Sequence, residues 1–307
     1  LNFSHAEHIA ARDIRVTGVQ CEECRYPYKP DTQFRCSDPV LERIWELCRE
    51  TMAACTTDVF MDCPWREHAF WVNDLLVENK SSLMLFGPSD VHRHSLDVLF
   101  SQQYENGWVP GVAPDNYNPE APVNILSPTN LFLFSVLEDY LWESADYSTA
   151  RKYLPNLLKI LTAFEKTADE TGLIQSLTYD SNFYDWSHEL NFITFNNARE
   201  SMLNSLYITA LKSYLWLCEQ TNTPCPEKME LKNRIERVSK ALRSFFVKHE
   251  TTGRRVLEDN AFAIDKATSE RTPIKFRSEL SQAFAINSNC LTTEEKNDLL
   301  RAILDGD

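Results

Sequence analysis

The most informative stretch of the sequence is Asp62-Cys63-Pro64-Trp65-Arg66-Glu67-His68-Ala69-Phe70-Trp71-Val72-Asn73-Asp74. It brings acidic side chains, an arginine and tryptophans together within a short length of chain. Aromatic faces suit the C–H surface of a sugar ring, and charged groups suit its hydroxyls. A carboxyl group near an arginine and a tryptophan can also have its pKa adjusted for proton transfer. The stretch therefore predicts a carbohydrate site with acid chemistry.

The spacing of these residues resembles the Asp-Cys-Pro-x-Arg-Glu…Trp-x-x-Asp signature of the α-L-rhamnosidases of glycoside hydrolase family 78. The matching positions are Asp62, Cys63, Pro64, Arg66, Glu67, Trp71 and Asp74. Weaker similarities at 34–41, at Asp185-Trp186 and at 281–285 extend the resemblance over most of the chain. Phe70 and Asn73 replace two glycines usual in the family, and a tryptophan usual near 125–130 is absent. These departures leave the identity of the sugar open.

The resemblance implies a role for each matching polar residue. Glu67 is the expected general acid, which protonates the leaving-group oxygen. Trp65, Phe70 and Trp71 would desolvate its carboxyl and favour the protonated form, while Arg66 would oppose that shift. The expected substrate-binding residues are Asp62, Arg66, Trp71, Asp74 and Trp186.

The residues alone leave structural alternatives open. Asp62 could cap a helix, Glu67 could be a surface residue at a helix start, and Trp186 could belong to the core. A helix through the stretch would place Glu67, Trp71 and Asp74 on one face, because they are four and three residues apart.

Helical periodicity dominates the chain from Ser37 onward. Ser37 or Asp38 can cap a first helix with one apolar stripe, formed by Val40, Ile44, Leu47 and Cys48. Further helices are predicted over about 72–86, 90–103, 129–143, 147–168, 198–220, 226–248, 278–289 and 293–304. Long connections at 104–128 and 173–197 carry aromatic and acidic residues, which predicts a cleft at one rim. We therefore expect an all-α fold, an (α/α)6 toroid that is incomplete at the C-terminus.

The first part of the chain differs from the rest. Residues 14–19 alternate apolar and polar side chains as a strand does. We expect 1–33 to be a remnant β segment left from a preceding β-sandwich domain, and 34–307 to be a partial catalytic domain. The chain begins at Leu1 without a basic and apolar leader, so we expect a processed or trimmed product. The compartment, bacterial periplasm or cytoplasm, stays open.

Composition restricts the partners. A net charge of −14 and a pI near 5.0 argue against nucleic acid and anionic membranes as partners. Cys21 and Cys24 have the spacing of a zinc knuckle, but without a second pair they predict a local disulfide or two free thiols. The resemblance implies no metal or organic cofactor. Trp142 and Trp216 are predicted core residues, and His92 a surface residue.

The predicted function is the hydrolysis of terminal α-L-rhamnosyl residues from glycosides with inversion, as the resemblance implies. The family's general base is expected in a loop beyond residue 307, so we expect this chain alone to be inert and to self-associate through an exposed apolar face. Hydrolysis by the chain alone would instead place the base among Asp115, Asp180, Asp185 and Glu189. Two alternatives remain: a toroidal hydrolase acting on another sugar, and a non-catalytic carbohydrate-binding or scaffold domain.

Overall fold

The computed structural model of the chain describes residues 17–29, 32–114, 125–175, 183–184, 200–259, 261–264, 271–274 and 277–306. The helices in these ranges are α1 Pro39–Ala54, α2 Val72–Phe86, α3 Asp90–Ser101, α4 Ser127–Ser144, α5 Tyr147–Glu165, α6 Ser201–Gln220, α7 Lys228–Leu242, α8 Glu279–Asn287 and α9 Thr293–Asp305. The short strands are β1 Phe70–Trp71, β2 Val112–Ala113, β3 Phe246–Lys248, β4 Arg255–Leu257, β5 Ala261–Ile264 and β6 Arg271–Ile274. They pair as three antiparallel two-stranded sheets, β1 with β2, β3 with β4 and β5 with β6.

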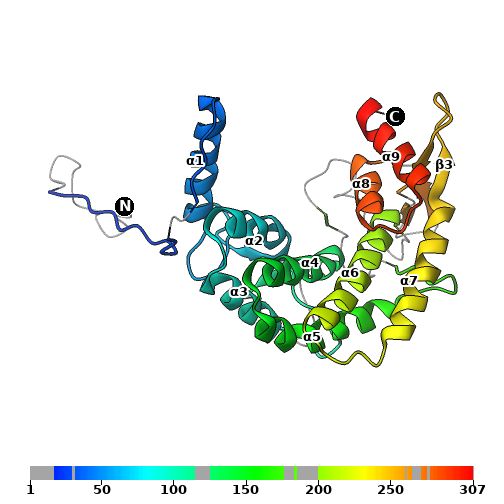
Figure 1. The fold of residues 1–307 in the computed structure, drawn as a ribbon, viewed down its shortest axis with the longest axis horizontal. Helices are drawn as coiled ribbons and strands as arrows, with labels where there is room; N and C mark the ends of the chain where they lie inside the picture. The colour runs from blue at the N-terminus through cyan, green and yellow to red at the C-terminus, as the bar shows by residue number, and fades with distance from the viewer. Residues whose placement is uncertain are drawn as a thin grey trace, which may run out of the picture.

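The helices follow one another around an arc, with α1 at one end and α9 at the other (Figure 1). Helices α2, α4, α6 and α8 form an inner row in which each packs extensively against the next. The odd-numbered helices lie outside this row and complete helical hairpins with the inner ones. This arrangement of consecutive hairpins confirms the predicted toroidal fold class.

Two of the inner helices, α4 and α6, are buried on nearly every side over part of their length. In α4 the residues from Leu131 to Phe134 are all buried, and in α6 the same holds from Ser201 to Ile208. A helix that is apolar all round is stable only when it is enclosed by other elements. The outer helix α7 carries its buried residues on one face, at Leu231, Arg234 and Val238, one turn apart. The sequence therefore sorts these helices into an inner and an outer layer.

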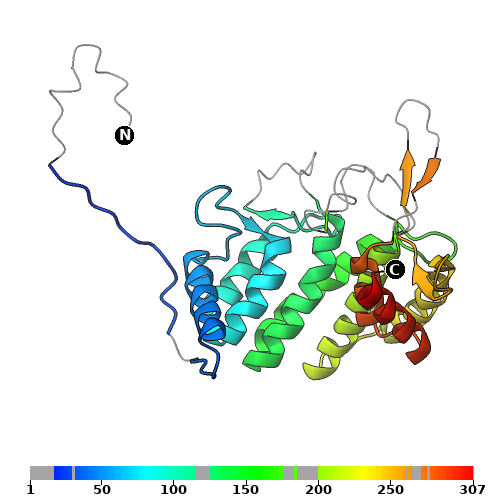
Figure 2. The ribbon, with the colours of Figure 1, turned by 90° about the horizontal axis from the view of Figure 1, so that it is seen from above.

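The connections between the helices are of two lengths. Long ones join α1 to α2, α3 to α4, α5 to α6 and α7 to α8, and so lead into the first residue of each inner helix. Short ones, at 87–89, 145–146, 221–227 and 288–292, lead into the outer helices. In Figure 2 the strands β1, β2, β5 and β6 of the long connections lie along one edge of the molecule, which we call the rim. The segments 115–124, 176–182 and 185–197 of the predicted rim loops lie outside the described residues.

Local capping explains several helix starts. The Asp38 side chain accepts a hydrogen bond from the Val40 amide at the start of α1. Ser89 begins α3 with a capping box closed by His92, and Thr292 begins α9 with a capping box closed by Glu295. Such caps satisfy backbone N–H groups that have no partner within the helix. The predicted helix starts at these positions are confirmed.

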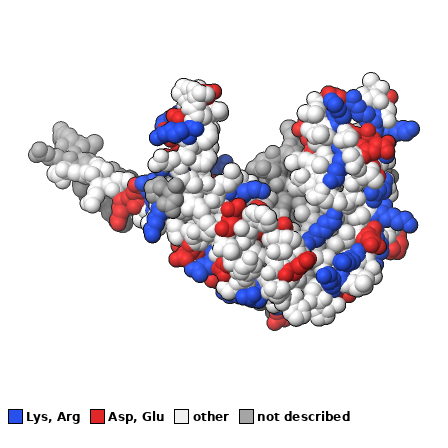
Figure 3. Space-filling view, viewed as in Figure 1, with Lys and Arg blue, Asp and Glu red and all other residues white. Residues whose placement is uncertain are grey.

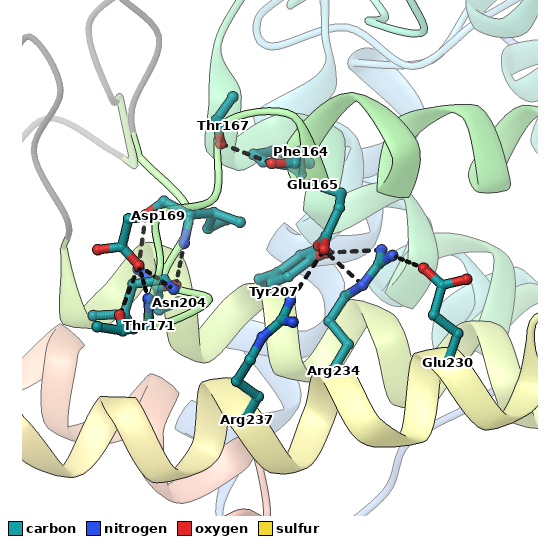
Figure 4. A network of polar contacts seen from close by, with 12 residues as sticks. Phe164, Glu165, Thr167, Asp169, Thr171, Asn204, Tyr207, Glu230, Arg234 and Arg237 are labelled. Carbon is teal, nitrogen blue, oxygen red and sulfur yellow. Dashed lines mark hydrogen bonds and ion pairs between the residues drawn. The ribbon is translucent and has the colours of Figure 1, made fainter.

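A partly buried ion-pair network joins α5, α6 and α7 (Figure 4). The Glu165 Oε2 atom lies 2.9 Å from the Arg234 Nε atom, and its Oε1 atom lies 3.0 Å from an Arg237 nitrogen. The hydroxyl of fully buried Tyr207 donates to Glu165 at 3.2 Å and accepts from Arg234 at 3.2 Å. Glu230 also pairs with Arg234, at 2.6 Å. The network fixes the outer helix α7 against the inner helix α6.

One part of the secondary-structure prediction is wrong. The helix expected over 226–248 ends at Leu242, and the chain continues through a 3-10 turn into β3. Phe246 there pairs with Leu257 of β4 in a β-hairpin, a pairing that helical periodicity does not reveal.

The N-terminal β segment stays a prediction. Residues 17–29 form neither helix nor strand, and residues 14–16 of the predicted strand lie outside the described residues.

Several side chains lie where sequence reasoning did not place them. Trp142 is 74% exposed, although its ring centroid lies 6.2 Å from that of partly buried Trp216. His92 is buried between the rings of Phe60 and Tyr140, and burial lowers its pKa to about 4. Trp142 is therefore not a core residue, and His92 is not a surface one.

The predicted apolar stripe of α1 is exposed. Val40 is 62% exposed and Ile44 is 49% exposed, whereas Met52 and Ala53, nearer the C-terminal end, are buried.

On the face of the molecule seen in Figure 3, acidic and basic side chains are interspersed, and neither sign of charge alone covers that face. No helix within the described residues is long and apolar enough to cross a bilayer.

Candidate active site

The stretch 62–71 forms a closed loop at the rim, and this loop ends in β1. The Asp62 amide donates to the Ala69 carbonyl at 3.1 Å, and the Ala69 amide donates to the Asp62 Oδ1 atom at 2.9 Å. His68 adopts a positive φ of 51°, which interrupts any helical path. The helix considered for this stretch is therefore absent, and α2 begins only at Val72. Asp62 closes the loop and does not cap a helix.

The Cys63 thiol fixes the interior of the loop. It donates to the Asp62 Oδ2 atom at 2.8 Å and accepts from the Glu67 amide, with an N–S distance of 3.3 Å. A ring nitrogen of His68 lies 3.1 Å from the Pro64 carbonyl oxygen. Asp62 thus accepts from the Ala69 amide with one carboxylate oxygen and from the Cys63 thiol with the other, and both contacts fix the loop that carries Arg66 and Glu67. The Asp-Cys-Pro part of the motif therefore fixes the conformation of the loop.

Arg66 and Glu67 lie next to each other at the loop surface. An Arg66 guanidinium nitrogen lies 2.7 Å from the Glu67 Oε1 atom, with the two side chains 78% and 36% exposed. Glu67 raises the pKa of Arg66 through this hydrogen bond. Trp65 is 92% exposed and Phe70 is in the core, so the predicted desolvation of Glu67 by these two rings is wrong. The Glu67 carboxyl is open to an incoming ligand.

Trp71 and Asp74 lie at the start of α2. Trp71 is the last residue of β1, which is held against β2, and the following amide of Val72 donates to the Gly111 carbonyl at 2.8 Å. Asp74 lies in the first turn of α2, where the helix dipole favours a negative charge. Glu67, Trp71 and Asp74 therefore come from a loop, a strand and a helix in succession.

The two positions where the family usually has glycine need no glycine backbone here. Phe70 is a strand residue with a buried ring, and Asn73 is a helical residue in α2. Neither has a positive φ, the conformation that favours glycine. The backbone at these two positions therefore has no need of glycine, and the two residues add side-chain volume.

Sequence reasoning missed Glu78, a fourth carboxyl of this region beside Asp62, Glu67 and Asp74. It lies in α2 one turn after Asp74, and its Oε2 atom is buried without a hydrogen-bond partner in the described residues. Burial, followed by the negative charges of Asp74 and Asp62, raises the pKa of Glu78 to about 9. The four-residue spacing between Asp74 and Glu78 could have shown that the two share a helix face. The burial of Glu78, however, depends on residues from other elements.

A second buried polar cluster links the starts of α6 and α8 at the same rim. The Tyr184 hydroxyl donates to the carboxylate of buried Glu200, and the pKa of Tyr184 is raised well above its ordinary value by burial and by Glu200. The Ser201 amide donates to the Asp259 carbonyl, and the Ser278 amide donates to the Asp259 carboxylate at 3.2 Å. Sequence reasoning did not single out Glu200 or Asp259, and their clustering required the tertiary fold.

Other predicted site residues lie outside the described residues. These are Trp186 and the alternative bases Asp115, Asp180, Asp185 and Glu189. Within the described ranges, no group of three or more His, Cys, Asp or Glu side chains could hold a metal ion. All nine cysteines, Cys21 and Cys24 included, are free.

The chain matches the family model described as bacterial alpha-L-rhamnosidase 6 hairpin glycosidase domain over residues 30–301. No curated protein sequence matches it.

Similar solved structures include a family 78 rhamnosidase of Bacillus sp. GL1, with a TM-score of 0.76 and 20% identity over 91% of this chain and 27% of that one. A rhamnosidase from Klebsiella oxytoca with rhamnose bound gives a TM-score of 0.65 and 20% identity, over 92% of this chain and 49% of that one. The Streptomyces avermitilis α-L-rhamnosidase complexed with L-rhamnose gives 0.64 and 13% identity, over 88% of this chain and 23% of that one.

This chain thus spans between about a quarter and a half of the length of these relatives. The structural likeness supports the toroidal fold, and the family model covers most of the sequence, including the whole 62–74 motif. The chain therefore belongs to the family of bacterial α-L-rhamnosidase six-hairpin glycosidase domains.

Proposed function

We propose that this domain, within its full-length protein, hydrolyses terminal α-L-rhamnosyl residues from glycosides with inversion, and that Glu67 is the general acid. The observation that carries the proposal is the closed 62–71 loop, which presents Arg66 and Glu67 side by side at the rim of long connections. A carboxyl at such a surface can reach a glycosidic oxygen, and the adjacent guanidinium can bind a sugar hydroxyl.

The proposed sugar site surrounds this pair. Asp62 and Asp74 would accept hydrogen bonds from ring hydroxyls, and Trp71 would lie against an apolar face of the ring. Trp186 would add a second stacking surface. The proposal assigns Asp62 a second task, because its carboxylate also holds the Cys63 thiol and the Ala69 amide.

Inversion requires a second carboxylate that activates water on the far face of the sugar. In inverting glycosidases the two carboxyl groups are about 6.5–9.5 Å apart. We place this base outside the described residues, either beyond residue 307 or among the alternatives that sequence reasoning named. The rhamnose-bound relatives support the substrate class, since their sugar is the one proposed here.

Arg66→Ala should weaken L-rhamnose binding about tenfold or more without changing the melting temperature. A charge-assisted hydrogen bond contributes about 1.5–3 kcal/mol, and the side chain is 78% exposed, so folding loses little. Titration calorimetry and thermal unfolding of the variant measure the two effects. Arg43→Ala is the matched control, because Arg43 forms a similar exposed pair with Glu46 at 3.1 Å. Equal affinities of the two variants would remove Arg66 from the site.

A panel of nitrophenyl glycosides, assayed with the full-length protein, tests the sugar. Preferential cleavage of the α-L-rhamnoside supports the proposal. Preference for another sugar would favour the alternative of a different toroidal hydrolase, for which the added volume of Phe70 and Asn73 is the motivating observation. Binding of rhamnose without cleavage of any glycoside would favour a carbohydrate-binding domain.

We also propose that this chain self-associates through α1. Its exposed apolar residues are Val40, Leu41, Ile44 and Leu47. Contiguous apolar patches commonly drive association. Light scattering should give a solution mass above the 35.5 kDa of one chain, and the double substitution Ile44→Lys and Leu47→Lys should lower it to that value. A wild-type mass of one chain would contradict the proposal.

A further inference from the structure

Three inner helices carry a buried side-chain amide at the same position, the fourth residue of the helix. These residues are Asn130 of α4, Asn204 of α6 and Gln282 of α8, and each is at most 3% exposed. Each amide donates to the carbonyl of the N-cap residue of its own helix, at 2.9–3.2 Å. Each also bonds to both backbone groups of one residue in the long connection that leads into that helix. We call this arrangement the amide clamp.

In α4 the clamped residue is Val109. Its backbone amide donates to the Asn130 Oδ1 atom at 2.8 Å, and the Asn130 Nδ2 atom donates to the Val109 carbonyl at 3.0 Å. The same two bonds, at 2.9–3.1 Å, join the other two pairs, Asn204 with Ile174 and Gln282 with Leu257. All three clamped residues are fully buried, so without the amide their backbone groups would lose partners that water cannot replace.

The first inner helix, α2, has no such amide, because its fourth residue is Leu75. Its entry is fixed instead by the connection between α3 and α4: β1 pairs with β2, and the Val72 amide donates to the Gly111 carbonyl at 2.8 Å. Pro110, whose ring restricts φ, is the single residue between Val109 and Gly111. A displacement of Val109 would therefore be carried to the entry of α2.

Trp71 lies at this entry. It is the last residue of β1, opposite Val112 of β2, and it directly precedes Val72. Its side chain is partly buried, and its Nε1 atom has no hydrogen-bond partner within the described residues. Because Nε1 is the polar atom of an indole, the place of the ring depends on packing and on the backbone of β1.

We propose that Asn130 is a positioning residue of the sugar site, which fixes the segment 109–113 and, through it, the backbone of Trp71. The inference rests on the proposed function, in which Trp71 lies against the sugar ring. Among the described strands β1 pairs with β2 alone, so the clamps on Ile174 and Leu257 do not act on β1. Asn130 itself is buried in the fold and acts on the sugar through the backbone.

Two substitutions of Asn130 test the clamp. Asn130→Leu keeps a similar volume and removes all the hydrogen bonds of the amide. Asn130→Asp keeps the acceptor for the Val109 amide, but an ionised carboxylate cannot donate to the Val109 carbonyl, and a protonated one can. The matched control, Gln282→Leu, removes a clamp of similar burial from the connection 243–278, which carries none of the proposed sugar-binding residues.

Hydrogen exchange of the full-length proteins tests whether the clamp acts on the entry of α2. In Asn130→Leu the Val72 amide, which bonds to Gly111, should exchange at least about tenfold faster than in the wild type, after correction for global stability. In Gln282→Leu the Leu257 amide should exchange faster, because it loses its acceptor, and the Val72 amide should keep its wild-type rate.

Calorimetry with L-rhamnose tests positioning. Asn130→Leu should bind about tenfold to a hundredfold more weakly, because small displacements of a positioned group have effects of this size. Asn130→Asp should be as weak at about pH 8 and should approach the wild type at about pH 5, since burial raises the pKa of an aspartate into this range. Gln282→Leu should lose stability and keep wild-type affinity. A merely structural role would not produce recovery of affinity on acidification.

Each outcome decides the inference. A wild-type rate of the Val72 amide in Asn130→Leu, or equal losses of affinity in Asn130→Leu and Gln282→Leu, would overturn it. Asn130→Asp without recovery at low pH would also overturn it. If Asn130→Leu does not fold, exchange of the Val72 amide in Asn130→Asp, relative to the wild type at the same pH, decides in its place.

Failure of the proposed function can be told apart from failure of the inference. If no protein, wild type included, binds rhamnose, the proposed function fails. Exchange of the Val72 amide then still decides whether Asn130 positions the entry of α2, because that measurement requires no sugar.

Discussion

The Glu67→Gln variant of the full-length protein should lose about 10²–10⁴-fold in kcat on rhamnosides with poor leaving groups, the usual contribution of general acid catalysis. Glutamine has nearly the same shape but cannot transfer a proton. An activated aryl leaving group needs little protonation, so its loss should be much smaller. The ratio of the two losses, from steady-state assays with both substrates, identifies the role of the residue.

Glu46→Gln is the matched control for this experiment. Glu46 is an exposed glutamate paired with Arg43 at 3.1 Å, comparable with the 2.7 Å pair of Glu67 and Arg66. It should show wild-type rates with both substrates. Equal losses of Glu67→Gln on the two substrates would show that Glu67 does not protonate the leaving group, although it contributes to the site.

The Glu165→Ala variant should be destabilised by about 1.5–3 kcal/mol, because it removes charge-assisted hydrogen bonds to the buried Arg234 guanidinium and leaves that group only the exposed Glu230 as a charged partner. The Arg234 side chain is only 8% exposed and bonds to Glu165 and to the buried Tyr207 hydroxyl, as Figure 4 shows. Arg237 would lose its pair with the same carboxylate. Chemical denaturation measures the free energy of unfolding.

The control is Glu230→Ala, which removes the other glutamate paired with Arg234. Glu230 is 67% exposed, so its contribution should be below about 1 kcal/mol. Both variants remove a glutamate that is paired with the Arg234 guanidinium, and the two glutamates differ in how far they are buried. Equal destabilisation by the two substitutions would show that the network does not hold α7 to the inner row.

Much of the fold was predictable because the helices are marked locally. Apolar periodicity and the caps at Asp38, Ser89 and Thr292 are properties of neighbouring residues, and the helix boundaries agree with them. The exception is the end of α7, where β3 pairs with Leu257 and its neighbours. Strand pairing depends on cross-strand contacts, so apolar periodicity alone continued the helix too far.

The motif could be located from the sequence, but its geometry could not, and its role as a sugar site stays a prediction. The motif named Asp62, Arg66, Glu67, Trp71 and Asp74, which the fold places in succession at one rim. The helix considered for the motif is absent, because two hydrogen bonds between Asp62 and Ala69 close a loop there. Those bonds depend on side-chain geometry that spacing does not specify.

By itself, the sequence determined the helical class, the approximate positions of the helices and the identity of the motif. These follow from local propensity and from apolar periodicity, which act over a few residues. The tertiary structure alone decided that Trp142 is exposed, that His92 is buried and that Glu78 holds its proton. The exposure and the pKa of a side chain depend on all its neighbours in space. For Glu78 these neighbours include Asp62 of the rim loop and Met61 of the segment before it.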